Sequence, residues 1–500
     1  MSALDGILAK GRPVEAHRPY PRVVVNAESW SELAAQLGAG QAVLSGLWGE
    51  AQAVHLAVMD DSFRVIVASL ECPDGAFPSV AQFHAPAIRL ERTIHDLFGL
   101  APRNAPDTRA WLDHGRWGVQ HPLGHAAPDE ALPPYAFIAN EGESLHQIPV
   151  GPVHAGIIEP GHFRFTANGE TVVRLEERLG YVHKGIEGLM ANADIAKGAK
   201  LAGRTSGDST VAYAMAFARA VEAAAEIEAP PRARYLRALM AELERLANHF
   251  GDIGAICNDA SFAMIHAHSG VLREHVLRAA DSCFGHRLMR DCVVPGGVAA
   301  ELNAKGAAAI AELISEARRT FPRLVRLYDD TASLQDRTVS TGILKPELAR
   351  QFGAGGYVGR ASGRAFDART ALPYAPYDAL GFTVPVLQDG DVNARIWIRI
   401  REVEQSLSLV EQILSRLPVG ALSIDVPPRG GEGMAFVEGF RGDILVWLRL
   451  DEGGRIARCH LRDPSWFQWP LLEAAIEGNI VADFPLCNKS FNCSYSGHDL

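Results

Sequence analysis

Two long segments with helical periodicity constrain the fold of this 500-residue chain most strongly. Residues 232–249 follow two prolines and place apolar side chains every three or four positions, which predicts a long helix with one buried face. Residues 396–416 repeat the pattern and predict a second such helix. Together with the stretch from 181 to about 350, which we also expect to be mostly helical, they indicate a helical body.

The first 120 residues predict a separate, small α+β domain. Short runs rich in β-branched and apolar residues predict strands at three places: 23–25, 53–59 and 63–69. Residues 87–98 have a helical period instead, with Leu90, Ile94 and Leu97 on one face. A chain of this length is too long for one ordinary core, which also favours more than one domain.

The rest of the chain divides into a linker and a second domain. Residues 121–147 are rich in proline and poor in periodic apolar residues, so they predict an extended connection. Residues 148–500 then form the second domain. The whole division is therefore 1–120, 121–147 and 148–500.

β-structure is expected at both ends of the second domain. The runs 162–167 and 171–175 alternate on either side of Asn168 and Gly169, which predicts a β-hairpin. Residues 442–450 predict a later strand. The expected fold class is α+β: a small N-terminal α+β domain, then a mostly helical domain with an N-terminal β-hairpin and peripheral β-structure.

Charge and cysteine content narrow the class of function. The formal net charge of −11 disfavours a nucleic-acid partner, because such proteins usually carry a basic face. No uninterrupted apolar run reaches the roughly 18 to 20 residues that span a bilayer, and the N-terminus lacks the apolar core of a secretion signal. The seven cysteines are scattered and never form a CxxC pair, which fits a reducing compartment. We expect a cytoplasmic protein.

Several long motifs resemble one family, in that family's order. Residues 151–190, GPVHAGIIEPGHFRFTANGETVVRLEERLGYVHKGIEGLM, are similar to the N-terminal hairpin and first helix of two relatives. These are the large subunit of group-4 (hydrogenase-3/-4 type) NiFe hydrogenases and the 49-kDa subunit of respiratory complex I. The similarity continues in four more segments: 232–260, 284–298, 359–378 and 390–407. Residues 85–118 resemble the complex I 30-kDa subunit, which the hydrogenase-3 and -4 type proteins carry fused ahead of the large subunit.

The resemblance implies a nickel–iron site whose ligands are missing here. In the family, two CxxC pairs hold the nickel, because soft thiolates suit this kind of metal. The first pair falls on Ser206 and Ser209, and the second falls on Ser494 and Gly497. Shifting the second match by one residue restores only Cys493. We therefore predict that this chain holds neither a nickel–iron centre nor another metal.

Glu159, Asp208 and Arg204 are candidate catalytic residues near these positions. The resemblance implies that Glu159 relays protons, as a glutamate in the matching hydrogenase motif does. The alternative is a structural ion pair between Glu159 and Arg164 or Arg204. Asp208 is a further candidate proton donor, because it stands between the two serines of the first replaced pair.

His154 is the candidate residue for quinone binding. In complex I the matching Gly-Pro-x-His hairpin lies at the tip of the quinone chamber. The second histidine of that family falls at Ile158, and its quinone-binding tyrosine falls at Gly207 or beside it. The sequence therefore departs from the quinone pattern, and quinone stays an open cofactor.

Two further groups have alternatives that the sequence leaves open. The resemblance implies that His183, Lys184 and Glu187 pack against an iron–sulfur small subunit and shape the cavity, with His183 facing the cavity or the cluster. The alternative for Lys184 is a position on a solvated helix face. A set of polar residues predicts a hydrogen-bond network, either in the core or at an interface: Arg360, Ser362, Asp367, Arg369, Tyr374, Tyr377 and Asp378.

A separate metal site near the C-terminal end is the less favoured interpretation of the late cysteines. Cys487, Cys493 and His498 are close in sequence, with Cys459 and His460 upstream. Their spacing matches no common zinc or iron–sulfur pattern. Buried structural thiols explain them better.

The resemblance also implies the assembly. The expected partners are a small subunit with a [4Fe–4S] cluster, a ferredoxin-like subunit, and membrane-arm subunits resembling those of complex I and antiporters. The chain would lie at the cytoplasmic face of the cell membrane and wall a cavity beside that cluster, coupling electron transfer to an ion-pumping arm. The alternatives are a quinone-reducing subunit like that of complex I and an inert scaffold.

Overall fold

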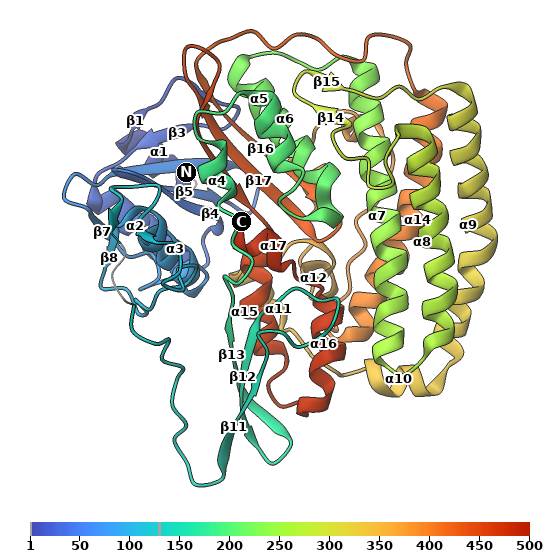
Figure 1. Cartoon of the computed structure of the whole chain (residues 1–500), viewed down its shortest axis with the longest axis horizontal. Helices are drawn as coiled ribbons and strands as arrows, with labels where there is room; N and C mark the ends of the chain where they lie inside the picture. The colour runs from blue at the N-terminus through green and yellow to red at the C-terminus, as the bar shows by residue number, and fades with distance from the viewer. Residues whose placement is uncertain (1–2, 129–131) are drawn as a thin grey trace.

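The computed structural model describes residues 3–128 and 132–500 and confirms the α+β class. Four long helices stand side by side on one side of the molecule (Figure 1): α7 (Pro231–Asp259), α8 (Ala263–Phe284), α9 (Ala304–Asp330) and α14 (Val392–Arg416). The two predicted long helices lie within α7 and α14. The first extends ten residues further than predicted, past Gly254, where an added Cβ would come within 3.0 Å of Ser269 Cβ. This glycine lets α7 and α8 approach closely.

The N-terminal region is a five-stranded sheet with three helices. The sheet order is β1 (Arg12–Pro13), β3 (Arg22–Val24), β6 (Val65–Glu71), β5 (Ala53–Met59) and β4 (Val43–Glu50). The helices are α1 (Ala3–Lys10), α2 (Ala27–Gly38) and α3 (Ile88–Phe98). Two of the predicted strands and the predicted helix are confirmed. The third strand begins later than predicted, because the Asp60 side chain accepts from the backbone N–H groups of Ser62 and Arg64 and holds a turn there.

A second sheet lies between the N-terminal region and the helices. Its order is β18 (Ile456–Arg462), β17 (Gly442–Leu450), β16 (Gly431–Gly439) and β2 (His17–Arg18). β17 confirms the predicted late strand. Helix α6 (Thr210–Ala225) packs on β16 and β17, and Gly433 permits this, since an added Cβ would lie 1.8 Å from Ala220 O.

The two regions of the chain share this second sheet. β2 comes from the N-terminal region and pairs in parallel with β16 at Glu432 and Gly433. Nearby, Arg22 forms a buried ion pair with Glu432. Trp48 of β4 stacks on His460 of β18 with ring centroids 5.1 Å apart. The two regions are therefore joined by strand pairing, charge and aromatic contact.

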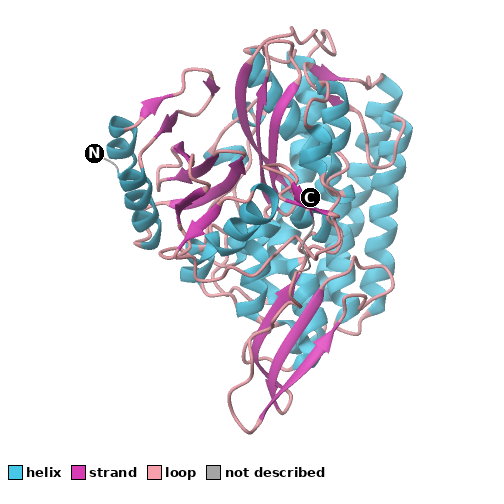
Figure 2. Ribbon diagram, turned by 60° about the vertical axis from the view of Figure 1, so that its left-hand side comes forward, coloured by secondary structure: helices cyan, strands magenta, loops and turns pink. Residues whose placement is uncertain are grey.

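A three-stranded sheet projects from one end of the molecule (Figures 1 and 2). It consists of β11 (Leu145–Val150), β12 (His162–Asn168) and β13 (Thr171–Arg178), so the predicted hairpin is confirmed and gains an edge strand. Gly169 adopts a φ of 58° in the turn, a conformation that favours glycine. At the start of the predicted linker, β10 (Ala127–Pro128) pairs with β9 (Val119–Gln120), which precedes the linker, and residues 129–131 lie outside the described residues.

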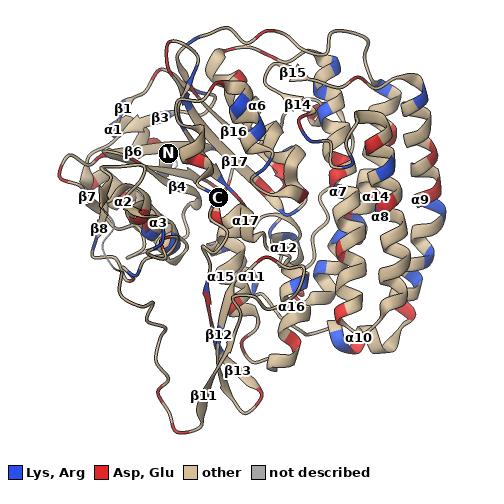
Figure 3. Ribbon diagram, in the orientation of Figure 1, with Lys and Arg blue, Asp and Glu red and all other residues tan. Residues whose placement is uncertain are grey.

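Shorter elements complete the large domain. The helices are α4 (Ile186–Met190), α5 (Ile195–Ala202), η2 (Gly207–Ser209), α10 (Ala332–Thr338), α11 (Pro346–Gln351), α12 (Gly356–Ala361), α13 (Ala368–Ala371), η3 (Tyr377–Ala379), α15 (Ser465–Ala475), η4 (Val481–Asp483), α16 (Phe484–Phe491) and α17 (Tyr495–Asp499). In Figure 3, acidic and basic residues alternate along α7, α8 and α9, so neither sign of charge dominates that side. In the part of the chain that the structure describes, no helix is long and apolar enough to cross a bilayer.

The predicted polar network lies in the core and not at an interface. Arg360 is fully buried and donates to Glu402 and Glu438 at 2.8 and 2.9 Å. Arg369 donates to Glu242 at 2.9 Å. The network ties α12, α13, α14 and β16 to the bundle helix α7. Asp378 alone among the predicted members is exposed.

Candidate functional site

Three of the four replaced ligand positions meet in space. We call Ser206, Ser209, Ser494 and Gly497 the serine site. Ser206 stands just before η2, Ser494 caps the N-terminus of α17, and their hydroxyl oxygens are 2.9 Å apart. Ser494 Oγ also accepts from the Gly497 N–H at 2.9 Å, and Ser206 Oγ donates to Asp208 Oδ1 at 2.9 Å. A continuous hydrogen-bond chain therefore runs from Gly497 through both serines to Asp208.

Asp208 pairs with a buried arginine at this site. Arg441, in the turn between β16 and β17, donates to both Asp208 oxygens at 2.7 and 2.6 Å. Burial would raise the pKa of Asp208, but Arg441 and the hydroxyls of Ser206 and Ser209 outweigh it and hold that pKa below its ordinary value. The carboxylate is thus ionised at neutral pH, and a guanidinium lies beside the serine site.

The space for a side chain at position 497 is already filled. A Cβ added to Gly497 would lie 2.3 Å from Asp463 Oδ2. Asp463 is itself fixed, since Tyr213 donates its hydroxyl to Oδ2 at 2.7 Å and the Ser465 N–H donates to Oδ1 at 2.8 Å. A cysteine at this position would therefore collide with a carboxylate that cannot easily move.

These residues do not fit a nickel–iron centre. The serine site offers hydroxyls and a glycine where thiolates are needed, and a hydroxyl stays protonated near neutral pH. The guanidinium of Arg441 would also repel a cation. Over residues 3–128 and 132–500, no group of three or more His, Cys, Asp or Glu side chains is arranged to hold a metal ion.

Two small cavities open beside Asp208. The larger, of about 300 Å³, lies between η2, α7 and α8, and its polar lining includes Asp208, Asn248, Asp252, His266, Arg273 and Asn492. The smaller, of about 100 Å³, reaches Asp208 and Glu244. A cavity of modest volume therefore lies beside the serine site, with the carboxyl groups of Asp208 and Glu244 on its wall.

Glu244 is a buried carboxyl group on the wall of the smaller cavity. Its oxygens accept from the backbone N–H groups of Val211 and Ala212 at the start of α6, at 2.7 and 3.1 Å. Burial raises the pKa of Glu244 to about 8 in spite of these donors, and the neighbouring Asp208 charge adds to the rise. At neutral pH Glu244 carries a proton and Asp208 does not.

Glu159 is bound to the C-terminal segment and not to an arginine. Its carboxylate accepts from the Ser496 N–H at 3.0 Å and from the Ser496 hydroxyl. The alternative ion pair is not found: Arg204 donates to Asp291 at 2.7 and 2.8 Å, and Arg164 donates to Gln147. Arg204 thus points away from Asp208, and Glu159 is exposed.

His154 and His183 contact the same C-terminal segment. His154 Nε2 lies 3.3 Å from the Tyr495 hydroxyl, and His183 Nδ1 lies 2.6 Å from Asp499 O. Together with Glu159, they surround residues 495–500, directly after Ser494. The structure therefore places His154, His183 and Glu159 against the segment that follows Ser494. In the described residues, none of these three side chains forms a hydrogen bond with Asp208.

Glu187 and the late cysteines lie inside this chain. Glu187 is buried, pairs with Arg458 at 2.8 Å and accepts from His460 at 2.8 Å. Burial would raise the pKa of Glu187, but these partners lower it to about 2. His498 is also buried, with its Nε2 3.3 Å from Trp111 Nε1. The predicted contact between Glu187 and a small subunit is therefore corrected to an interior ion pair.

Four residues at this site could not be recognised from the sequence. Arg441, Asp463, Tyr213 and Glu244 come from a turn, a strand end and two helices that are far apart in the chain. A charged residue in a tight turn, such as Arg441 between two apolar strands, is ordinarily solvated. Only the pairing of β16 with β17 carries it to Asp208.

Comparison with known proteins gives matches to two family models. Residues 260–429 and 422–499 match the model described as the 49-kDa subunit of respiratory-chain NADH dehydrogenase. Residues 23–131 match the model described as the 30-kDa subunit of the same enzyme. The two matches follow the order expected from the motifs.

Two curated proteins of Escherichia coli K12 are similar over most of their length. Formate hydrogenlyase subunit 5 is 32% identical over 441 residues, covering 85% of this chain and 77% of that protein. Hydrogenase-4 component G is 30% identical over 479 residues, covering 92% and 82%. A chain of the membrane-bound sulfane sulfur reductase, an archaeal respiratory membrane complex, has the same fold with a TM-score of 0.68 at 24% identity; the match covers 72% of this chain and all of that one.

Proposed function

The chain belongs to the family that joins the 49-kDa subunit of respiratory NADH dehydrogenase to the large subunits of membrane-associated hydrogenases, and from this premise we propose that it works without a metal centre of its own. It is a subunit of a multi-subunit oxidoreductase. In our proposal it lies against the membrane through its partners and walls a cavity beside the [4Fe–4S] cluster of a small subunit. Redox events in that cavity would be coupled to an ion-pumping membrane arm.

One observation carries the proposal: the residues at the ligand positions are bonded to each other. Ser206 and Ser494 share a hydrogen bond of 2.9 Å, where a metal would have to stand between their side chains. Two neighbours support the proposal as well. The guanidinium of Arg441 would repel a metal cation, and Asp463 fills the space that a side chain at position 497 would need. The site is built as a polar network, with no need of a metal to satisfy its groups.

The chain's own residues can hold and move a proton at this cavity. Glu244 is protonated and Asp208 ionised near neutral pH, and both lie on the wall of the 100 Å³ cavity. An electron acceptor reduced there would need a proton, and Glu244 is the group beside it that carries one. Arg273 and His266 on the larger cavity would hold an anionic or polar acceptor.

Metal analysis of the purified complex tests this function. We expect less than about a tenth of an equivalent of nickel per large subunit, an order-of-magnitude limit for a site without thiolates, together with no hydrogen uptake. A hydrogenase of the same family, purified and assayed in parallel, is the positive control. Stoichiometric nickel in this complex would refute the proposal.

The quinone and scaffold alternatives are separated by substitution within the complex. If the chain is a quinone-reducing subunit, His154→Ala should abolish turnover with quinone analogues. Two observations disfavour that role: His154 Nε2 already contacts Tyr495, and no tyrosine stands at position 207. An inert scaffold predicts full activity after Asp208→Asn combined with Glu244→Gln. An assembled but inactive complex would exclude inertness.

A further inference from the structure

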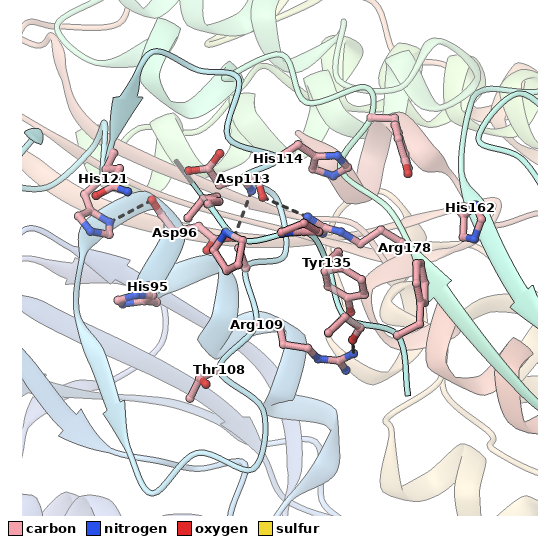
Figure 4. A pocket seen from close by; sticks show the side chains of 18 residues that line it. His95, Asp96, Thr108, Arg109, Asp113, His114, His121, Tyr135, His162 and Arg178 are labelled. Carbon is pink, nitrogen blue, oxygen red and sulfur yellow. Dashed lines mark hydrogen bonds between the residues drawn. The ribbon is translucent and has the colours of Figure 1, made fainter. Parts of the chain in front are cut away.

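A further cavity, whose lining includes no residue of the serine site, lies elsewhere in the fold. It has a volume of about 630 Å³ and is bounded by α3, the loop 107–114, the segment 132–137 and the ends of β12 and β13 (Figure 4). It thus lies where the N-terminal region, the connecting segment and the large domain meet. Ligand sites of this size commonly occur at such junctions.

A buried arginine on its wall lacks a counter-ion. Arg178, at the end of β13, is 4% exposed and donates only to the backbone carbonyls of Asp113 and Leu179, at 3.0 and 3.4 Å. No carboxylate in residues 3–128 or 132–500 lies within ion-pair distance of it. Burial accordingly lowers the pKa of Arg178 to about 10. An unpaired buried guanidinium is costly and calls for a partner.

The acids that share the cavity are already engaged. One oxygen of Asp96 accepts from the backbone N–H groups of Trp111, Leu112 and Asp113, at 2.7, 2.7 and 3.3 Å. Asp113 accepts from the Gly115 N–H at 2.7 Å. Neither carboxylate accepts a hydrogen bond from Arg178, and the charge of Asp96 acts on the guanidinium only from beyond ion-pair distance.

The other arginine on the wall is neutralised, and three aromatic side chains form part of the remaining wall. Arg109 donates to both Asp107 and Glu176, at 2.7 and 2.6 Å. Tyr135 lies against Arg178, with the guanidinium carbon 4.5 Å from the ring centroid. Phe137 and Tyr181 line the cavity as well. In Figure 4, Arg178 reaches between Tyr135 and the loop that carries Asp113 and His114.

We propose that this space, the Arg178 cavity, binds a small organic anion. A carboxylate or phosphate group of the ligand would pair with Arg178, and its apolar body would lie against Tyr135, Phe137 and Tyr181. His95, whose Nδ1 is buried without a hydrogen-bond partner in the described residues, supplies one further polar contact. The inference is independent of the redox function proposed above, because none of its residues belongs to the serine site or lines the two cavities beside Asp208.

Calorimetric titration of the full-length chain with benzoate and with inorganic phosphate, at constant ionic strength, tests the proposal. We expect benzoate to bind, and the affinity to fall about tenfold or more in Arg178→Gln, the loss typical of one charge-assisted hydrogen bond. Arg350→Gln is the matched control, because Arg350 is exposed and pairs with Asp61 away from the cavity. Arg178→Lys, which keeps the charge, should recover part of the affinity and guards against loss of folding.

Two results would overturn the proposal. The first is no binding of either probe to the wild-type chain. The second is equal affinity in Arg178→Gln and Arg350→Gln.

Discussion

At the residue scale, the serine site replaces metal coordination by internal pairing. A site that loses thiolates and keeps its shape would leave buried polar atoms unsatisfied, which is costly. Here each replaced position has an internal partner: Ser206 with Ser494, Ser209 with Asp208, and Gly497 with the Ser494 oxygen. The substitutions thus form one consistent set, and reversing any one of them alone should be unfavourable.

Gly497→Cys should destabilise the chain by about 2 kcal/mol, a usual cost of overpacking. The reason is the collision of the new Cβ with Asp463 Oδ2. Urea unfolding measures it, with Gly6→Cys as the control, because an added Cβ at Gly6 meets nothing within 4 Å. In an Asp463→Ala background the cost should shrink, and an undiminished cost there would contradict the steric account.

Asp208→Asn should cost roughly 2 kcal/mol, because it leaves the guanidinium of Arg441 buried without a carboxylate. Losing one partner of a fully buried pair costs about 3–5 kcal/mol. We expect less here because the Asp208 side chain is 37% exposed, so water screens part of the charge. Asp291→Asn breaks the exposed pair with Arg204 and should cost about 0.5 kcal/mol. Equal losses in the two variants would show that Arg441 does not depend on Asp208.

At the element scale, local pattern predicted the elements that bury one face and missed those whose position depends on distant contacts. The alternation of apolar residues around Asn168 predicted a hairpin, and the apolar stripe along 232–249 predicted a helix. By contrast, β2 is a two-residue strand whose partner, β16, lies more than 400 residues later, and no local pattern encodes such a pairing. The same limit applies to the site: the sequence identified Ser206 and Ser494, whereas Arg441 is brought there by a turn between strands.

Trp48→Ala should weaken the packing between the N-terminal sheet and the second sheet. It should lower the free energy of unfolding by about 3–5 kcal/mol, as for other buried aromatic side chains. Trp48 stacks on His460 and lies 5.6 Å from the Trp447 ring, so its loss should also increase amide hydrogen exchange in β17 and β18. Trp30→Ala, equally buried but packed on Phe77 within the N-terminal region, is the control. If both variants raise amide exchange in β17 to the same extent, Trp48 has no special role in the packing between the two sheets.

At the scale of the whole molecule, two opposed sets of buried groups set the response to pH. Burial lowers the pKa of His17 and His114 to about 4, so acid favours the unfolded chain, whose histidines bind protons near pH 6.5. Burial raises the pKa of Glu91 and Glu244 to about 7 and 8, so these carboxyls act in the opposite direction. The stability of the wild-type chain therefore reflects a balance, and removing one group should tilt it.

His17→Gln and Glu244→Gln should change the pH dependence of the free energy of unfolding in opposite directions. His17 contributes stability that is present above about pH 6.5 and lost as the pH falls toward 4, so its variant should lose less stability than the wild type between pH 7 and 5. Glu244 contributes stability that is present below about pH 4.3 and lost as the pH rises toward 8. The free energy of unfolding of its variant, relative to that of the wild type, should therefore be higher at pH 7 than at pH 5. Each difference should be roughly 1–2 kcal/mol, measured by urea unfolding at both pH values. Tilts of the same sign would mean that Glu244 is ionised throughout, held by the Val211 and Ala212 N–H groups, and that it has no proton to give at neutral pH.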